Sequence, residues 1–201
     1  MRSLARVVGL STLLISAATG CGREPAPPPA ASAASPASAP GPAPSTAAAP
    51  DPLVGHAAPD FTAKTQSGAD VHLAALKGKP VVVYFYPKDE TPGCTKEACS
   101  FRDAWTDLDK QGVVLIGISA DTDASHRAFA EHHKLPFLLV SDPDGKIAGQ
   151  FGVPFTAGYP QRQSFVIGRD GSVVNAYRKV DVTKHAKEIS DNVAATAAKG
   201  P

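Results

Sequence analysis

The segment TPGCTKEACS, residues 91–100, holds two cysteines that could do redox chemistry. Cys94 follows the turn-forming pair Pro92-Gly93, and Cys99 comes five positions later. This spacing is longer than that of a CxxC redox pair, and no second pair follows that would complete a zinc site. A disulfide across so short a loop would add little stability. The pair is therefore predicted to be reactive rather than structural.

Cys94 is predicted to lie at the start of a helix over residues 95–110. The apolar residues that follow it recur with helical spacing: Ala98, Phe101, Ala104, Trp105 and Leu108. Unpaired backbone N–H groups and the positive end of the helix dipole favour an anion at such a position. Helix N-termini lower the pKa of a thiol from about 8.5 to roughly 3.5–7.5. The sequence thus predicts a nucleophilic thiolate at Cys94.

On an intact helix the two cysteines cannot bond to each other. Five residues correspond to a rise of about 7.5 Å and place the two Cα atoms roughly 8–9 Å apart. A disulfide requires about 4.4–6.8 Å between Cα atoms. If Cys94 and Cys99 do bond, the first helical turn must unwind, so we expect the reduced and oxidised forms to differ in shape.

The longer segment YFYPKDETPGCTKEACSFRD, residues 84–103, resembles the peroxiredoxins. It carries Pro87, Thr91 and Cys94 in the spacing PxxxTxxC of that family. The whole segment is similar to the bacterioferritin comigratory protein, or Q-type, branch. The resemblance extends over the domain, from the APDF motif through SDPDGKIAGQFGV to the last helix.

The resemblance implies a role for each residue of this motif. Cys94 would be the peroxidatic cysteine, whose thiolate attacks the peroxide O–O bond and becomes a sulfenic acid. Cys99 would be the resolving cysteine and form the intramolecular disulfide. Thr91 would place its hydroxyl by the thiolate and the peroxide, Pro87 would shield the thiolate from water, and Arg162 in QRQSFVIG would match the family's arginine. A guanidinium keeps its charge, so it can stabilise both the thiolate and the leaving oxygen.

The implied activity is that of a thiol peroxidase that needs no metal or organic cofactor. It would reduce hydrogen peroxide and organic hydroperoxides, act as a monomer, and be recycled by a thioredoxin-like dithiol protein. Two alternatives use the same fold: a thiol–disulfide oxidoreductase, which would need CxxC, and a copper-binding assembly factor, which would hold Cu(I) with closer cysteines and a distal histidine. Neither alternative explains Thr91 together with Arg162.

Charged residues around the motif allow two interpretations. Glu97 suits a first helical turn, but a carboxylate near a thiolate opposes its ionisation, so Glu97 is either structural or the partner of a cation. A metal cluster could form from Glu131, His132 and His133 together with His126. A solvated helix face is the preferred interpretation of these four residues.

Residues 1–21, MRSLARVVGLSTLLISAATGC, have the pattern of a secretory signal, with an apolar run shorter than the ~20 residues that span a bilayer. The motif Ala18-Thr19-Gly20-Cys21 resembles the lipobox of bacterial lipoproteins, with alanine where leucine is usual. Ordinary cleavage near Ala18 is the alternative. On the lipoprotein interpretation, Cys21 carries a lipid anchor that holds the protein on the periplasmic side of a bacterial cell envelope, and Gly22 is consistent with the outer membrane.

The rest of the chain divides into a tether and one domain. Residues 22–52 are rich in proline, alanine and serine, so they are predicted to be a disordered tether. Residues 53–201 have the length of one domain. Their alternating strand-like and helix-like segments predict an α/β, thioredoxin-like fold with an N-terminal β-hairpin extension and a mixed central sheet flanked by helices. The predicted elements are hairpins around Ser67-Gly68 and Asp170-Gly171, strands at 80–87, 113–120 and 137–142, and helices at 95–110, 125–133, 146–151 and 182–198.

Opposite charges are nearly balanced over the chain. Twenty lysines and arginines stand against 19 aspartates and glutamates, which gives a formal charge of +1. Such a balance provides no electrostatic basis for a nucleic-acid partner.

Overall fold

The computed structural model describes residues 51–197. The predicted signal sequence, the predicted lipid-attachment residue Cys21 and most of the predicted tether lie outside these residues. Asp51 forms an ion pair with Arg178 at 2.5 Å, so the folded domain includes the last two residues assigned to the tether. Among the described residues, no helix is long and apolar enough to cross a membrane.

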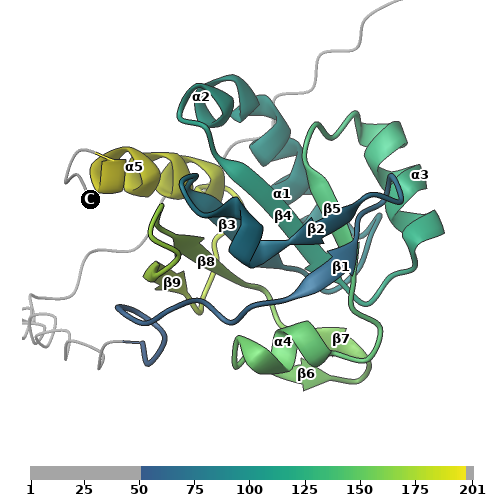
Figure 1. Ribbon diagram of the computed structural model, residues 1–201. Coiled ribbons are helices and arrows are strands. Elements are labelled where there is room, and N and C mark those ends of the chain that lie inside the picture. Colours follow the sequence, from purple (N-terminus) through teal and green to yellow (C-terminus); the bar gives the residue numbers. More distant parts are fainter. Residues whose placement is uncertain (1–50, 198–201) are drawn as a thin grey trace, which may run out of the picture. The chain divides into compact units, whose positions relative to one another are not determined.

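A five-stranded mixed sheet forms the centre of the domain, in the strand order β5-β4-β3-β8-β9 (Figure 1). Strands β3, β4 and β5 are parallel to one another, whereas β8 is antiparallel to both β3 and β9. All five residues of β3 are buried, as its unbroken apolar run predicts for a strand covered on both faces. The strands are β3 (Val81–Phe85), β4 (Val114–Ser119), β5 (Leu138–Ser141), β8 (Gln163–Ile167) and β9 (Val173–Tyr177).

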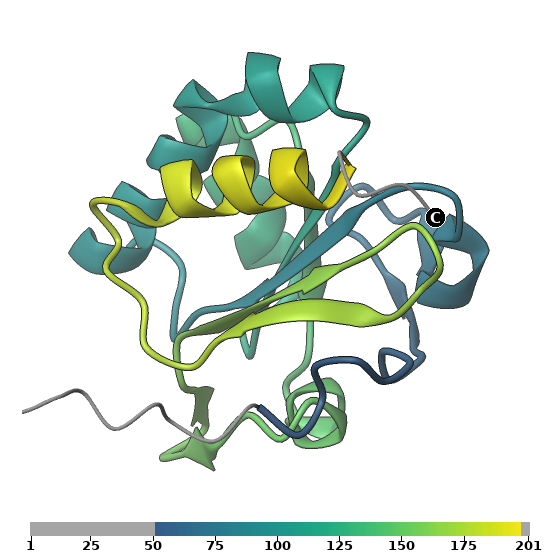
Figure 2. The same cartoon turned by 90° about the vertical axis from the view of Figure 1, so that its left-hand side faces the viewer.

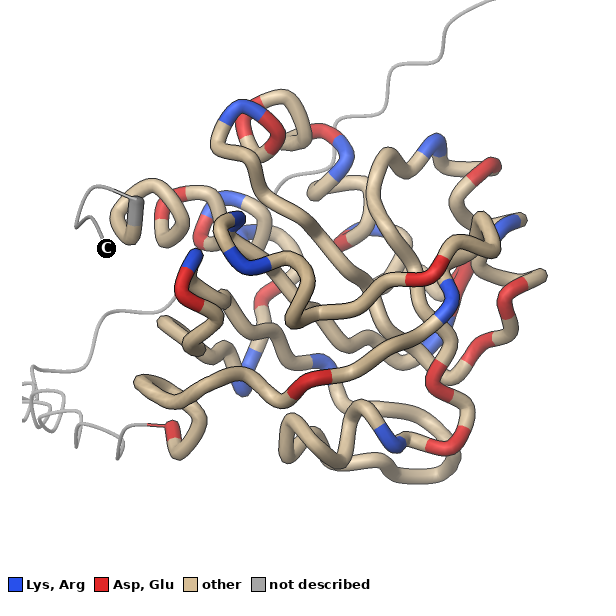
Figure 3. Tube along the Cα trace, in the orientation of Figure 1, with Lys and Arg blue, Asp and Glu red and all other residues tan. Residues whose placement is uncertain are grey.

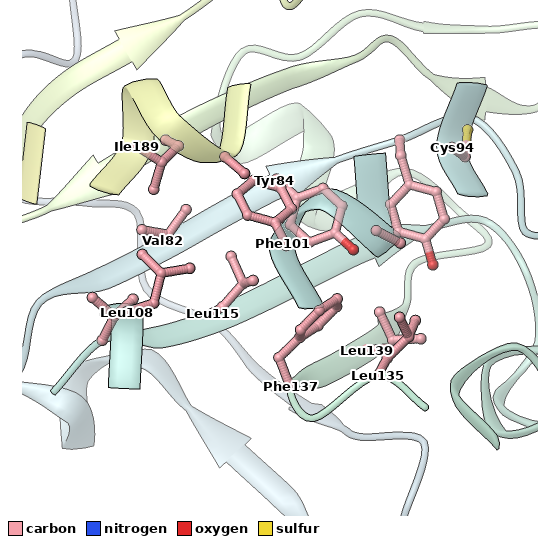
Figure 4. Packing of buried hydrophobic residues seen from close by; sticks show 14 of the residues in the cluster. Val82, Tyr84, Cys94, Phe101, Leu108, Leu115, Leu135, Phe137, Leu139 and Ile189 are labelled. Atoms are coloured by element: carbon pink, nitrogen blue, oxygen red, sulfur yellow. The ribbon is translucent and has the colours of Figure 1, made fainter. Parts of the chain in front are cut away.

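Helices cover one face of this sheet, and α5 lies across it (Figure 2). Tyr84 of β3 contributes to the core on this side and packs against Phe101, with 5.1 Å between ring centroids. Figure 4 shows this cluster, with Cys94 at one end of it. The helices on this side are α1 (Pro92–Asp103), α2 (Trp105–Lys110), α3 (Asp123–His133) and α5 (His185–Ala197).

The opposite face is covered by the N-terminal hairpin and by α4. Phe85, next to Tyr84 along β3, points to this side because successive strand residues alternate between faces. It packs against Phe151 and Phe165. The elements on this side are β1 (Thr62–Lys64), β2 (Asp70–His72), the 3₁₀ helix η1 (Leu73–Leu76) and α4 (Lys146–Gln150). The predicted α/β fold, with its mixed sheet and N-terminal hairpin, is confirmed.

The helix that carries the cysteines differs from the prediction at both ends. It begins at Pro92 rather than at residue 95, because proline suits the first helical position, where its missing N–H costs nothing. Thr91 is the N-cap residue, so Cys94 is the third residue of the helix. The predicted single helix also breaks at Ala104 into α1 and α2.

A small hairpin is present that the sequence pattern does not predict. It consists of β6 (Phe155–Thr156) and β7 (Tyr159–Pro160), joined by Ala157 and Gly158 in left-handed backbone conformations. Strands of two residues leave no periodic pattern, and alanine is not a usual residue at positive φ. Basic and acidic residues are interspersed along the described chain (Figure 3).

Candidate active site

Cys94 lies buried in the first turn of α1, with 2% of its surface exposed. The loop from β3 leads into this turn, so the sulfur lies beyond the carboxyl end of a central strand. Residues at i, i+3, i+4 and i+7 share one face of a helix, and Cys94, Glu97, Ala98 and Phe101 are the buried residues of α1. The Cys94 sulfur therefore points into the domain together with the Glu97 carboxylate.

Arg162 contacts both of these groups. It directly precedes β8, whose first residue Gln163 lies opposite Phe85, the last residue of β3. This register places Arg162 beside the loop that leads to α1. One guanidinium nitrogen, Nη2, donates to the Cys94 sulfur at 3.0 Å, and Nη1 donates to Glu97 Oε2.

Burial affects the pKa values of both Glu97 and Arg162. Desolvation raises the pKa of Glu97 from 4.5 to about 7, and the Arg162 guanidinium opposes this only in part. For Arg162, burial acts to lower the pKa, but Glu97 and Cys94 outweigh it and raise the pKa above its usual value. A permanent cation is thus shared between a sulfur and a carboxylate. Of the two sequence interpretations of Glu97, the structure supports the partner of a cation.

Thr91 and Pro87 flank Cys94 on the approaching loop. Pro87 is half-buried and lies two residues after the end of β3. The Thr91 hydroxyl donates to the carbonyl of Lys88 at 2.9 Å, and it makes no capping hydrogen bond to α1. The loop and the first turn of α1 thus carry Pro87, Thr91 and Cys94, and strand register brings Arg162 to the Cys94 sulfur. The Thr91 hydroxyl is bound to the loop.

Comparison with known proteins identifies the family of this chain. A model of the AhpC/TSA family matches residues 54–176. The putative peroxiredoxin bcp of Coxiella burnetii is 46% identical over 143 residues, which are 68% of this chain and 95% of that protein. The chain belongs to the AhpC/TSA family, in its Q-type peroxiredoxin branch.

Other relatives place this peroxiredoxin in the same branch. Chloroplastic peroxiredoxin Q of Gentiana triflora is 47% identical over 137 residues, which are 67% of this chain but 63% of the plant protein. The chain thus spans less than two thirds of that relative's length. Among solved structures, peroxidoxin BcpB from Mycobacterium tuberculosis superposes with a TM-score of 0.66 at 34% identity, over 71% of this chain and 97% of that one. The bacterioferritin comigratory protein of Xanthomonas campestris superposes with a TM-score of 0.63 at 34% identity, over 68% of this chain and 92% of that one.

Cys99 of this peroxiredoxin lies on the side of α1 rather than on its buried face. It is half-buried, and its sulfur is 3.9 Å from Nδ1 of His133 at the end of α3. Both cysteines are free thiols on one continuous helix. Because helix geometry separates their Cα atoms by roughly 8–9 Å, disulfide formation requires α1 to unwind locally, as the spacing predicts.

A buried polar group that the sequence does not reveal fixes the loop before α1. Asp89 accepts hydrogen bonds from the hydroxyls of Tyr86 and Ser125, each at 2.7 Å, and contacts Nδ1 of His126 at 2.9 Å. Burial opposes the ionisation of Asp89, but these hydrogen bonds outweigh it and lower its pKa below 3.8. The other nitrogen of His126, Nε2, faces the carbonyl of Val140 at 3.2 Å. The loop is thereby attached to α3 through groups 36 and 37 residues away in sequence.

The same contacts separate the four residues that could have formed a metal cluster. His126 is fully buried and bound to Asp89, away from solvent. His132 and His133 lie at the end of α3 and contact Glu90, not Glu131. The metal grouping considered from the sequence is therefore wrong in its members. The preferred interpretation, a solvated helix face, is wrong for His126, which is fully buried.

Proposed function

We propose that this peroxiredoxin reduces hydrogen peroxide and organic hydroperoxides with Cys94 as the peroxidatic residue. The observation that carries the proposal is the 3.0 Å contact between Arg162 Nη2 and the buried sulfur in the first turn of α1. A helix N-terminus and a guanidinium both stabilise a thiolate. The bacterioferritin comigratory protein of Xanthomonas campestris has alkyl peroxide reduction activity, which supports hydroperoxides as the substrate class.

In the first step the Cys94 thiolate attacks the terminal oxygen of the hydroperoxide. A sulfur–oxygen bond forms, the O–O bond breaks, and the alkoxide leaves and takes up a proton as the alcohol, or as water when the substrate is hydrogen peroxide. The sulfur is oxidised to a sulfenic acid and the peroxide is reduced by two electrons. Arg162 remains charged throughout, so it stabilises first the thiolate and then the negative charge on the leaving oxygen.

In the second step the Cys99 sulfur attacks the Cys94 sulfenic acid. A disulfide forms and the sulfenic oxygen leaves as water, for which the first turn of α1 must open. An external dithiol then reduces this disulfide by thiol–disulfide exchange and becomes a disulfide itself. We propose a thioredoxin-like protein as this dithiol, and a monomer as the working unit.

The location is also a proposal. The signal-like residues 1–21 and the Pro/Ala/Ser-rich residues 22–52 support export and a lipid anchor on Cys21 in the bacterial envelope. Labelling of the expressed protein with a radioactive fatty acid tests this, with Cys21→Ala as the control. Label that persists in Cys21→Ala would contradict the anchor at this residue.

Rapid mixing with peroxide tests the activity. Trp105, the first residue of α2, is separated from the end of α1 by Ala104 alone, so its fluorescence should report unwinding. We expect two phases in the wild-type protein, no reaction in Cys94→Ser, and the first phase alone in Cys99→Ser. Peroxide consumption by Cys94→Ser at the wild-type rate would refute the proposed role of this residue.

A further inference from the structure

Two histidines and a glutamate meet on the surface beside the active site. One carboxylate oxygen of Glu90 is 3.0 Å from His132 Nδ1, and the other is 3.0 Å from His133 Nε2. One ligand atom from each of the three side chains lies within 4.8 Å of the others. We call Glu90, His132 and His133 the two-histidine cluster.

The cluster is assembled from two separate elements. Glu90 belongs to the loop before α1, where its backbone has a positive φ of 58°, and its neighbour Asp89 attaches that loop to α3. His132 and His133 are the last two residues of α3. The C-terminal end of a helix carries partial negative charge, which favours a cation at this position.

One side of the cluster is held in place and the other is open to water. The ring of His133 packs against Phe129, with 5.0 Å between centroids, and its side chain is 16% exposed. Glu90 and His132 are 50% and 70% exposed. A bound ion could thus take three protein ligands and complete its coordination with water, as metals do in sites with open positions.

We propose that the two-histidine cluster binds a divalent transition-metal ion, with Zn²⁺ as the probe. Imidazole and carboxylate are the donors that suit Zn²⁺ and its neighbours in the first transition series. Arg102 donates to the carbonyl of His133 at 3.0 Å and pairs with Asp103 at 2.8 Å, so part of its charge is compensated. Hydrogen bonds between the two rings and Glu90 are the alternative explanation of the geometry, and binding measurements separate the two.

Metal binding has a consequence that rests on the proposed function. Glu90 immediately precedes Thr91, the N-cap of α1, and disulfide formation requires the first turn of α1 to open. An ion that links Glu90 to the end of α3 would hold this turn in its folded form. Bound Zn²⁺ should therefore slow the reaction of Cys99 with the sulfenic acid and leave the attack of Cys94 on peroxide unchanged.

The binding experiment uses the full chain with all three cysteines replaced by serine, so that thiols do not contribute. Zn²⁺ affinity is measured by competition with a chromogenic chelator, and Co²⁺ absorption reports the coordination geometry. We expect Glu90→Gln and His132→Asn each to weaken Zn²⁺ binding at least tenfold. The matched controls are Glu131→Gln, on the same helix, and His56→Asn, both at exposed positions outside the cluster, and they should bind like the parent.

Two results would overturn the site: no Zn²⁺ binding by the parent, or equal affinity in Glu90→Gln and Glu131→Gln. Because His132 is 70% exposed, His132→Asn provides a second readout if Glu90→Gln folds poorly. Circular dichroism of each variant separates a loss of fold from a loss of ligand.

The kinetic experiment uses reduced protein with its native cysteines, with and without saturating Zn²⁺. We expect the second fluorescence phase to slow at least fivefold in the wild-type protein and to remain unchanged in Glu90→Gln. An unchanged second phase in Zn²⁺-loaded protein would overturn the regulatory consequence. If the metal-free protein shows no peroxide phase, the proposed function fails, whereas the binding result stands independently.

Discussion

The Arg162 guanidinium lies between two acidic groups of one helix face and donates to the Cys94 sulfur at 3.0 Å and to the Glu97 carboxylate. Cys94 and Glu97 are three residues apart, so the helix alone brings them to the same side. Arg162 lies 65 residues after Glu97 in the sequence and is placed by the antiparallel register of β8 on β3. The site therefore exists only when the central sheet and α1 are both formed.

Loss of this cation should slow the peroxide reaction. We expect Arg162→Gln to lower the second-order rate constant about 10²–10³-fold, because charge stabilisation of the leaving oxygen is lost. Arg162→Lys should recover only part of the wild-type rate constant. A lysine ammonium cannot replace a planar guanidinium that donates to two groups at once. Arg169→Gln is the control, because the Arg169 side chain is exposed and donates to the backbone carbonyls of Gly78 and Gln111.

The Arg162→Gln result needs one further variant. Removing the arginine leaves Glu97 buried without its partner, which could destabilise the domain. The double variant Arg162→Gln/Glu97→Gln removes that unpaired carboxylate. If the double variant reacts with peroxide at the wild-type rate, Arg162 does not take part in the chemistry.

Glu97 should make stability depend on pH. Burial raises its pKa from 4.5 to about 7, so between these values the folded protein binds a proton that the unfolded chain does not. The stability contributed by this proton is fully present below about pH 4.5 and is lost as the pH rises through 7. The difference in free energy of unfolding between the wild type and Glu97→Gln should change with pH. We expect it to favour the wild type by about 3 kcal/mol more below pH 4.5 than above pH 7.

Urea unfolding of the two proteins at several pH values between about 4 and 8 measures this difference. Other titrating groups cancel in the comparison, including buried His185, whose pKa is lowered to about 4 by desolvation and by Arg162. A difference that does not vary with pH would mean that Arg162 keeps Glu97 ionised throughout.

Asp89 should contribute more to stability than a surface aspartate. Its side chain is 2% exposed and accepts three hydrogen bonds, so Asp89→Asn should lower the free energy of unfolding by about 2–4 kcal/mol. Ser125→Ala removes one of these bonds and should cost about 1 kcal/mol. If urea unfolding shows that the two substitutions lower the free energy of unfolding equally, the Asp89–His126 pair contributes no more to stability than a single hydrogen bond.

A glycine in the central sheet gives a test of the packing. A Cβ at Gly117 of β4 would lie 2.7 Å from the Tyr84 ring and 2.8 Å from a Leu139 methyl group. We expect Gly117→Ala to destabilise the domain by about 1–3 kcal/mol. Gly149 in α4 has no atom within 4 Å of the added Cβ, so Gly149→Ala should be neutral or stabilising by about 0.5–1 kcal/mol. A stable Gly117→Ala protein would contradict this packing.

Local patterns in the sequence identify most of the chemistry. Cys94, Thr91 and Pro87 lie on one short segment, so their spacing alone predicts that they meet. The predicted start of α1 is wrong by three residues, because Pro92-Gly93 has the composition of a turn although proline also suits the first helical position. That the helix carries both cysteines, and that they are unbonded while it is folded, follows from spacing and is found in the structure.

Contacts between distant segments could not be predicted in this way. Asp89 meets His126 37 residues later, and Glu90 meets His132 42 residues later. These pairs form because the loop after β3 lies against α3 in the folded domain. No periodicity in either segment predicts this contact. The sequence also leaves the role of Glu97 open, because the side on which Arg162 lies depends on strand register.

Mass spectrometry of the oxidised protein shows directly whether Cys94 is the residue that reacts with peroxide. Reduced wild-type protein and Cys99→Ser are each treated with one equivalent of hydrogen peroxide in the presence of a sulfenic-acid trap and then digested. We expect a Cys94–Cys99 disulfide in the wild type and a trapped sulfenic acid on Cys94 in Cys99→Ser. An unmodified Cys94 in both proteins after the peroxide has been consumed would contradict this expectation.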